Sequence, residues 1–317
     1  MDVDNYLKDN PLWIADIGAS GGINKRWSRI TDYYKAILFE PDPREYKQLK
    51  DIKNNNLIVL NSALSDSTSE MHLNLCKRQE VSSFYTPNFN FIKNYPDHQR
   101  FEIVEQILLP VDTLNNQLRK NSIEEIDFIK IDVQGHELPI LKGSDEYLKN
   151  VIGMEVEVEF VEVYENQPLF FEVDYFIREK DFELYDLKRY FWKNKHEIYS
   201  KESKGQLIFG DALYFKKPEK LLSIQNIDEK KILRSVFVYL SYGYVGLARE
   251  LIIKSNEKNI IKDELKDDVL IFLSKQESNC SLPDFKGKDR LGLVFENLAN
   301  KFRTNHFSTG TDKKIGN

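Results

Sequence analysis

The sequence predicts an α/β protein that carries a β-hairpin insertion and a C-terminal helical extension. In the first two thirds of the 317 residues, short β-branched apolar runs alternate with amphipathic stretches, which is typical of a sheet covered by helices. The alternation breaks between residues 64 and 110, and beyond Pro218 only helical patterns remain. We therefore expect a first domain at 1–217, a helical extension at 218–303 and a disordered tail at 304–317.

Each element follows from its local pattern. Apolar runs predict main-sheet strands at residues 13–17, 36–40, 57–62, 128–133, 151–160, 182–187 and 207–215. Amphipathic stretches predict helices at 23–32, 45–53, 137–141 and 170–180. Within the interruption, extra strands are expected at 71–75, 81–85 and 101–109. Residues 230–242 and 247–255, joined by a glycine turn, predict an antiparallel helix pair, and a further helix is expected at 264–275.

Charge and cysteine content exclude several classes of protein. The formal charge of −6 argues against a protein devoted to binding nucleic acid or anionic lipid. Cys76 and Cys280 lie far apart, which fits neither a disulfide framework nor a paired metal motif. The polar, acidic start is unlike a signal peptide, and no apolar run approaches the ~20 residues that span a bilayer. We expect a cytoplasmic protein with no transmembrane segment and no nucleic-acid partner.

A glycine-rich turn follows the first strand, at residues 14–22. Its spacing, Asp-x-Gly-x-x-x-Gly, differs from the Gly-x-Gly-x-x-Gly turn of dinucleotide enzymes, which disfavours a nicotinamide cofactor. Asp16 suits a cationic ligand such as S-adenosylmethionine, and Glu40 at the tip of the second strand can accept hydrogen bonds from ribose hydroxyls. The alternative interpretation is an ordinary turn whose glycines only pack and whose Glu40 caps a helix.

A second glycine motif follows the strand at 128–133. Asp132, His136 and Glu137 would lie at its carboxyl end, where open α/β sheets bind ligands. Methyl transfer to a hydroxyl requires positioning and the loss of a proton, so His136 is a candidate base by its intrinsic pKa. Asp132 is a candidate for orienting the acceptor or meeting the cofactor's ammonium group. A lone histidine at a strand exit is otherwise a surface or hydrogen-bonded residue.

These two motifs belong to an ordered set of six that resembles the FkbM family of methyltransferases. Its members are the loop at 16–22, the segment at 39–43, Val-Asp-Thr-Leu at 111–114, the motif at 129–137, Gln-Pro-Leu-Phe at 167–170 and Gly-Asp-Ala-Leu at 210–213. The resemblance covers about residues 10–217. Ser20 stands where the family usually has Asn, and Gln134 where it usually has Glu, so a charge-based role at Gln134 is in doubt.

The resemblance implies a Rossmann-like class I methyltransferase sheet, S-adenosyl-L-methionine as cofactor, and O-methylation of sugar hydroxyls in glycans or of natural products. We predict Asp132 and His136 at the reaction centre. The residues expected to bind the cofactor are Asp16, Gly18, Ala19, Ser20, Gly22, Glu40, Ala63, Leu64 and Asp132. A saccharide or other small molecule is the expected acceptor. A non-catalytic scaffold that binds the cofactor and acts through its helical extension is the competing hypothesis.

Three features lie outside these motifs. The alternation at 154–160 places Glu155, Glu157 and Glu159 on one strand face, so Glu155 and Glu157 are weak candidates for a divalent-metal site, although a solvated or salt-bridged face is the favoured interpretation. Aromatic residues of the insertion form a candidate lid, and the cluster at 189–192 could stack on a sugar or simply pack. The C-terminal helices could dimerise, cover the acceptor, bind a partner enzyme or be passive.

Overall fold

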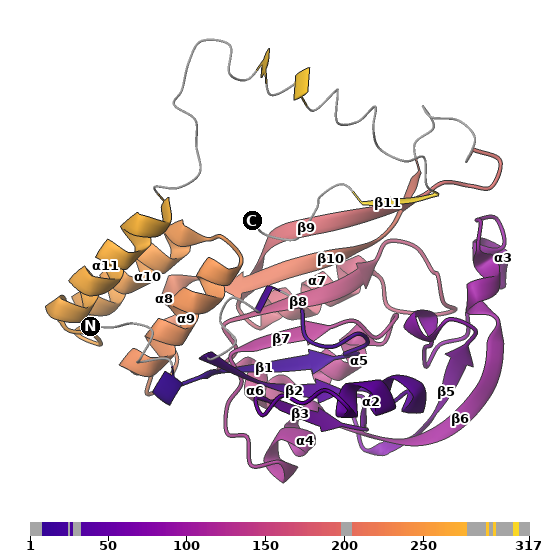
Figure 1. Ribbon diagram of the computed structural model, residues 1–317, viewed down its shortest axis with the longest axis horizontal. Helices are drawn as coiled ribbons and strands as arrows, with labels where there is room; N and C mark the ends of the chain where they lie inside the picture. Colours follow the sequence, from indigo (N-terminus) through magenta and orange to yellow (C-terminus); the bar gives the residue numbers. More distant parts are fainter. Residues whose placement is uncertain are drawn as a thin grey trace.

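The computed structural model describes residues 8–24, 26–27, 33–197, 205–277, 290–291, 294–295 and 307–310. They form an eight-stranded sheet in the order β11-β9-β10-β8-β7-β1-β2-β3 (Figure 1). Its strands are β1 (Leu12–Ile17), β2 (Tyr34–Phe39), β3 (Leu57–Leu60), β7 (Phe128–Ile131), β8 (Gly153–Glu159), β9 (Phe182–Trp192), β10 (Gln206–Lys216) and β11 (Ser308–Gly310). The α/β class and all seven predicted main-sheet strands are confirmed.

The strand order places one edge of the sheet for ligand binding. The strands β3, β2, β1, β7 and β8 are parallel neighbours, whereas β10 is antiparallel to both β8 and β9. The five parallel strands have the 3-2-1-4-5 arrangement of doubly wound nucleotide-binding sheets when they are counted along the chain. Their carboxyl ends therefore lie side by side, and the loops that follow them can share one ligand.

The insertion forms a second sheet of three strands, in the order β4-β6-β5. These are β4 (Ala63–Leu64), β5 (Ser69–Cys76) and β6 (Ile103–Asp112). The strand predicted at 81–85 is wrong, because a 3₁₀ turn, η2 (Gln79–Val81), and a single bridge between Asn74 and Ser83 replace it. The Ser82 hydroxyl accepts from the Cys76 amide and the Ser83 hydroxyl donates to the Gln134 carbonyl, so side chains here take partners that would compete with a ladder.

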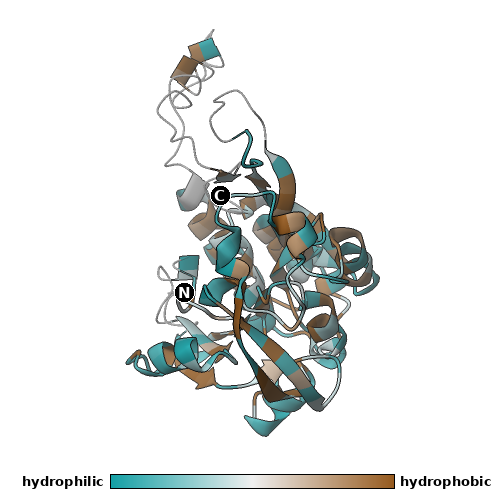
Figure 2. Cartoon of the chain, turned by 90° about the vertical axis from the view of Figure 1, so that its right-hand side faces the viewer, coloured by the Kyte–Doolittle hydropathy of each residue, from teal (hydrophilic) through white to brown (hydrophobic). Residues whose placement is uncertain are grey.

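Helices cover both faces of the main sheet. They are α2 (Pro43–Lys50), α4 (Leu114–Lys120), α5 (Glu137–Lys142), α6 (Asp145–Leu148), α7 (Phe170–Glu179), α8 (Pro218–Leu221), α9 (Glu229–Ser241), α10 (Val245–Glu257) and α11 (Asp263–Glu277). The insertion contains a further short helix, α3 (Phe89–Ile92), and a 3₁₀ turn, η3 (His98–Phe101). One core joins the sheet to α4, α5 and α7, and the other joins it to α9, α10 and α11. Figure 2 shows hydrophobic and hydrophilic residues alternating along these helices, as expected when one side of each faces a core.

Most of the helix predicted at 23–32 lies outside the described residues. Within its described part, Arg26 and Trp27 form part of a 3₁₀ turn.

The C-terminal extension packs directly on one face of the sheet. On this face, Ile14, Phe128 and Phe215 of the sheet share a core with Leu233 and Val236 of α9. The extension therefore completes the hydrophobic core of the sheet.

A buried charge cluster fastens α9 to the sheet. Asp127, which is 0% exposed, accepts hydrogen bonds from Lys231 Nζ at 2.7 Å and Arg234 Nε at 3.1 Å. Its second oxygen accepts from the Trp13 amide at 2.9 Å, and Arg234 also pairs with Glu125. Because a buried charge is tolerated only when it is paired, this cluster fixes where α9 lies.

Part of the tail that the sequence predicts to be disordered forms a strand. Within this tail, β11 pairs with β9 in antiparallel fashion, and most of the other tail residues lie outside the described part.

None of the described helices is both long and apolar enough to cross a bilayer.

Candidate functional site

A cavity of about 310 Å³ opens at the carboxyl ends of β3, β2, β1 and β7. Its lining combines segments that follow these strands with side chains of the insertion: Gly18 and Ser20, Glu40 to Asp42, Ser62 and Leu64, Asp132 to Gln134, and Leu73, Gln79, Glu80, Ser82 and Phe84. The volume and the mixture of apolar walls with a few polar groups are typical of a small-molecule site. The position is the one that the strand order predicts.

The glycine turn brings bare main chain to this cavity. Gly18 has a positive φ of 77°, and a Cβ on it would lie 1.8 Å from the Asp132 carbonyl oxygen. Gly18 is thus required because β1 and β7 approach closely here. Gly21, with a φ of 76°, has no described atom within 4 Å of a Cβ position, so its backbone stays open. A ligand can therefore lie against this turn.

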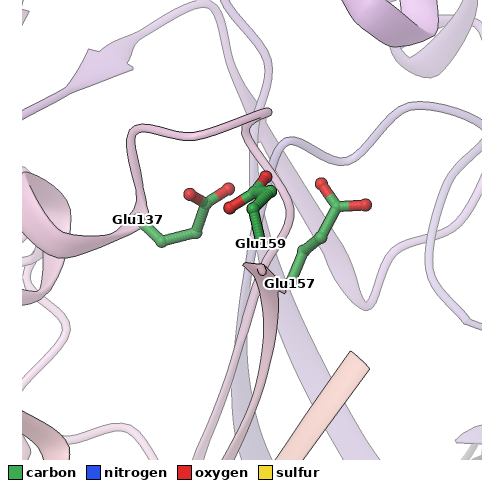
Figure 3. Close-up of side chains that lie close together, drawn as sticks. All are labelled: Glu137, Glu157 and Glu159. Atoms are coloured by element: carbon green, nitrogen blue, oxygen red, sulfur yellow. The ribbon is translucent and has the colours of Figure 1, made fainter. Parts of the chain in front are cut away.

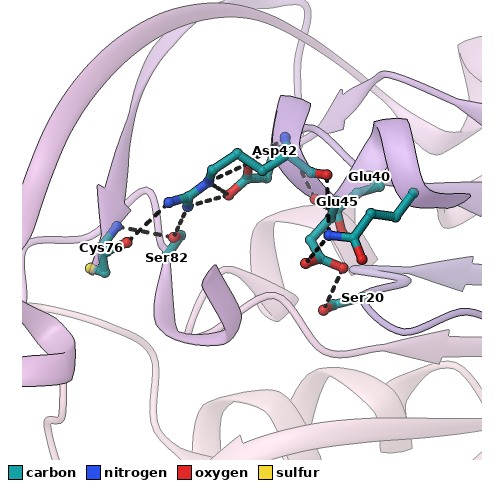
Figure 4. A network of polar contacts seen from close by, with 8 residues as sticks. Ser20, Glu40, Asp42, Glu45, Cys76 and Ser82 are labelled. Carbon is teal, nitrogen blue, oxygen red and sulfur yellow. Dashed lines mark hydrogen bonds and ion pairs between the residues drawn. The ribbon is translucent and has the colours of Figure 1, made fainter. Parts of the chain in front are cut away.

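Glu40 lies at the end of β2 in the wall of the cavity and is 5% exposed. Its Oε1 accepts a hydrogen bond from the Asp42 amide at 2.9 Å, which fixes the carboxyl group (Figure 4). Burial raises the pKa of Glu40 to about 7. A carboxyl group held in this position can accept hydrogen bonds from a ribose, as the sequence predicts.

Asp16 lies behind the turn, outside the cavity lining, and is 2% exposed. Its Oδ1 has no hydrogen-bond partner among the described residues, and Lys130 Nζ is 4.0 Å from it. Burial raises the pKa of Asp16 to about 6, which the nearby Lys130 partly opposes. A cationic ligand would stabilise this buried carboxylate, so Asp16 fits the long-range role of a counter-charge.

The other predicted cofactor residues divide into two groups. Ser20 and Leu64 line the cavity, and the Ser20 hydroxyl donates to Glu45 at 3.2 Å. Ala19, Gly22 and Ala63 are absent from the lining, and the two alanines are buried in the protein. Direct contact of these three residues with the cofactor stays a prediction.

Asp132 follows β7 and faces the cavity. Lys130 Nζ lies 3.3 Å from its Oδ2, and Gln134 Nε2 donates to its Oδ1 at 3.1 Å. Burial opposes ionisation, but Lys130 and the hydrogen bond from Gln134 outweigh it, so the pKa of Asp132 is lowered. Asp132 is therefore an ionised hydrogen-bond acceptor at the end of the cavity nearest β8.

His136 does not line the cavity. It is 3% exposed, its ring lies against Phe84 and Tyr85, and its Nε2 is 3.0 Å from the Ser65 hydroxyl. Burial lowers the pKa of His136 to about 4, so the imidazole is neutral near pH 7. Its role as general base stays a prediction, and the geometry gives it a less direct position than Asp132.

The glutamates of β8 are buried, contrary to the solvated face favoured from the sequence. Glu155, Glu157 and Glu159 are 6%, 8% and 3% exposed. Glu155 accepts a hydrogen bond at 2.8 Å from the hydroxyl of Tyr242, which lies at the end of α9. Glu157 accepts a hydrogen bond from Gln134 Nε2 at 2.6 Å. The strand alternation could not reveal these covering groups, because they come from distant segments. The structure also separates the two metal candidates, since Glu155 lies outside the cluster that Glu157 forms with Glu137 and Glu159 (Figure 3).

The insertion supplies lining residues that the sequence did not single out. Arg44 of α2 binds Asp42 and also donates to the Cys76 carbonyl at 3.3 Å and the Ser82 hydroxyl at 3.4 Å (Figure 4). Asp42 and Ser82 both line the cavity, so Arg44 fastens the insertion to its rim. Phe84 was within the predicted aromatic lid.

Packing accounts for the aromatic cluster at 189–192. The Tyr190 ring stacks on Phe209 with 4.5 Å between ring centroids. Trp192 is 4% exposed and contacts Tyr95 and Phe101. Of the two interpretations, packing fits these two residues.

The chain is similar to proteins of known classes. A methyltransferase FkbM domain matches residues 16–184, more than half of the chain. No curated protein shows significant similarity. Similar solved structures include a precorrin-6y C5,15-methyltransferase from Geobacter metallireducens (11% identity, 68% of this chain and 87% of that chain, TM-score 0.33). Others are a putative RNA methyltransferase from Pyrococcus horikoshii (11%, 68% and 83%, 0.31) and a SAM-dependent methyltransferase from Agrobacterium tumefaciens (8%, 68% and 59%, 0.33).

The structural resemblances are too distant to bear on the acceptor. The match to the family domain begins at Asp16, near the end of β1, and extends past β8 to the start of β9. It therefore contains Glu40, Asp132 and the rest of the cavity's lining. The chain belongs to the FkbM methyltransferase family and is a methyltransferase whose cofactor is S-adenosylmethionine.

Proposed function

We propose that this methyltransferase acts on a hydroxyl group, that of a saccharide in surface glycan biosynthesis. The observation that carries the proposal is the placement of Glu40 and Asp132 in the lining of one cavity, with the bare Gly18 turn on the strand between them. A saccharide offers hydroxyl donors to the Asp132 carboxylate in this lining. Bound here, S-adenosylmethionine supplies an electrophilic methyl group.

The residues divide the work by their position along the sheet. Glu40, after β2, would hold the ribose, and Ser62 and Leu64, after β3, would border the adenine. Asp132, after β7, would accept a hydrogen bond from the acceptor hydroxyl and take its proton as the methyl bond forms. Gln134 and Lys130 hold the Asp132 carboxylate, so they act as positioning residues.

Cofactor binding provides the first test. Calorimetric titration with S-adenosylhomocysteine should show one site per chain, and a folded protein that does not bind would overturn the proposal. Turnover on a panel of saccharides, followed by release of S-adenosylhomocysteine, tests the second half. Tight cofactor binding with methylation of no acceptor would favour the scaffold, and methylation of non-sugar hydroxyls alone would favour a natural-product acceptor.

The base is identified by comparing two variants. Asp132→Asn should abolish turnover, because the amide cannot take a proton, and its effect on cofactor affinity tests the predicted contact of Asp132 with the cofactor. His136→Ala would abolish turnover if the histidine is the base, and would lower it modestly if the histidine only packs against Phe84 and Tyr85. Wild-type turnover by Asp132→Asn would contradict the role that we give to Asp132.

Two broader features belong to the same proposal. A cytoplasmic location is supported by Cys76, which is buried and free. A homo-oligomer or a partner enzyme could bind through the C-terminal helices, where Ile253 and Ile271 are exposed. Light scattering of the purified chain tests the first of these two associations.

A further inference from the structure

Three buried carboxylates lie together beside the proposed acceptor site. Glu137 begins α5, while Glu157 and Glu159 lie on β8. One oxygen of each side chain lies within 4.8 Å of the others, and Figure 3 shows the carboxylate of Glu159 between the other two. The three side chains belong to residues that are 1%, 8% and 3% exposed. Three like charges buried this closely require either protons or a cation.

The hydrogen bonds leave one buried oxygen of this cluster without a donor. Glu137 Oε1 accepts from the amides of Val133 and Gly135, at 3.0 and 3.2 Å, which favours its ionised form. Glu159 Oε2 is buried and accepts no hydrogen bond of normal geometry from the described residues, although Gln167, whose Nε2 is also unpartnered, interacts with this carboxyl group. A buried carboxylate oxygen without a partner is unfavourable, so an unpaired oxygen on a member of this cluster indicates a missing cation or proton.

The cluster is connected to the cavity through Gln134. This residue lines the cavity, and its Nε2 donates both to Asp132 Oδ1 at 3.1 Å and to Glu157 Oε2 at 2.6 Å. The cavity extends over the ends of β3, β2, β1 and β7, and β8 is the next strand in the sheet. The cluster therefore lies behind Gln134, outside the lining itself, at the end of the cavity away from Glu40.

We propose that Glu137, Glu157 and Glu159 bind a divalent cation, Mg²⁺ or Mn²⁺, which holds oxygen atoms of the acceptor. Carboxylate oxygens are the ligands that these cations prefer. The identity of the acceptor in this proposal rests on the proposed function, whereas the cation site itself does not. A cation here would lower the pKa of a coordinated acceptor hydroxyl. The hydroxyl proton would pass to Asp132 as the hydroxyl oxygen bonds to the methyl carbon. The sulfur of the donor would keep the electron pair of the broken sulfur–carbon bond.

The structure supplies both test variants and a matched control. Glu159→Gln removes the charge with the unpartnered oxygen, and Glu157→Gln removes the charge next to Gln134. Glu155→Gln is the control, because Glu155 lies on the same strand and is equally buried but its carboxylate is bonded to Tyr242 outside the cluster. Mn²⁺ alone is the probe, measured by calorimetry and by the loss of its free-ion electron paramagnetic resonance signal.

We expect wild type to bind one Mn²⁺ per chain without acceptor, and Glu159→Gln and Glu157→Gln to weaken binding at least about tenfold. Glu155→Gln should bind Mn²⁺ as wild type does. Titration with S-adenosylhomocysteine is run on each protein, since it reports folding and the cofactor site independently. A wild type that binds S-adenosylhomocysteine but no Mn²⁺ overturns the cation site and leaves the proposed function standing. Equal loss of Mn²⁺ binding in Glu155→Gln would also overturn it.

Discussion

Replacing Asp127 by alanine tests whether the C-terminal extension is part of the methyltransferase fold. The carboxylate is fully buried, and its partners Lys231 and Arg234, which also pair with Glu125, are 5% and 7% exposed. Asp127→Ala leaves both cations beneath the sheet and removes the acceptor of the Trp13 amide. Breaking one partner of a buried ion pair typically costs about 3–5 kcal/mol. For a chain of this size we expect a fall in melting temperature of order 10 °C.

The assay is thermal unfolding followed by circular dichroism, combined with urea titration for the free energy. Glu125→Gln is the control, because Glu125 contacts the same cations but is partly exposed, and it should shift the melting temperature by a few degrees at most. A melting temperature of Asp127→Ala within about 2 °C of wild type would refute the reasoning, since α9 would then be held by its apolar face alone.

The pH dependence has a defined sign. Burial opposes ionisation of Asp127, but Lys231 and Arg234 lower its pKa in the folded state. Its stabilisation is therefore present above the unfolded-state pKa, near 3.9, and is lost as pH falls through the lower folded-state value. The stability difference between wild type and Asp127→Ala should shrink on acidification over that range.

Three further predictions concern the cavity. Because the pKa of Glu40 is about 7, calorimetry should show S-adenosylhomocysteine affinity rising between pH 6 and 8 by up to about tenfold. Glu40→Gln should bind the ligand weakly, and its affinity should depend less on pH. The same pH profile in the variant as in wild type would exclude Glu40 as the group that causes it. Gly18→Ala should abolish binding and lower stability, because its Cβ would meet the Asp132 carbonyl at 1.8 Å, whereas Gly21→Ala, with open space, should remain folded; equal melting temperatures for the two variants would contradict this. Arg44→Ala should increase the stopped-flow release rate of S-adenosylhomocysteine severalfold with little change in melting temperature, and an unchanged rate would show that Arg44 does not hold the insertion over the ligand.

The sequence predicts those parts of the site that depend on local pattern and strand order. Gly18, Glu40 and Asp132 each follow an apolar run, and parallel strands bring their carboxyl ends together. The lining residues Gln79, Glu80 and Ser82 show no such pattern. Arg44 contacts Ser82 and the Cys76 carbonyl of this segment from a helix more than 30 residues earlier, and a single sequence does not reveal that contact.

Burial was the harder quantity to predict. The alternation of glutamates with apolar residues on β8 is typical of a strand with one solvent-exposed face. In the structure, Tyr242, 87 residues away in the sequence, covers Glu155, and Gln134 covers Glu157. His136 has a suitable intrinsic pKa, which the surrounding protein lowers to about 4. In both cases the residue type indicates the available chemistry, and distant segments decide its protonation.

The position of α9 also has a consequence for synthesis of the chain on the ribosome. All the residues that line the cavity precede residue 141, but the partners of Asp127 are translated about a hundred positions after it. Until then, the face of the sheet formed by Ile14 and Phe128 lacks its cover and resembles the exposed apolar surface of a folding intermediate. Methyl-donor binding should therefore mature late, and a nascent chain stalled before α9 emerges should attract chaperones and fail to retain the ligand.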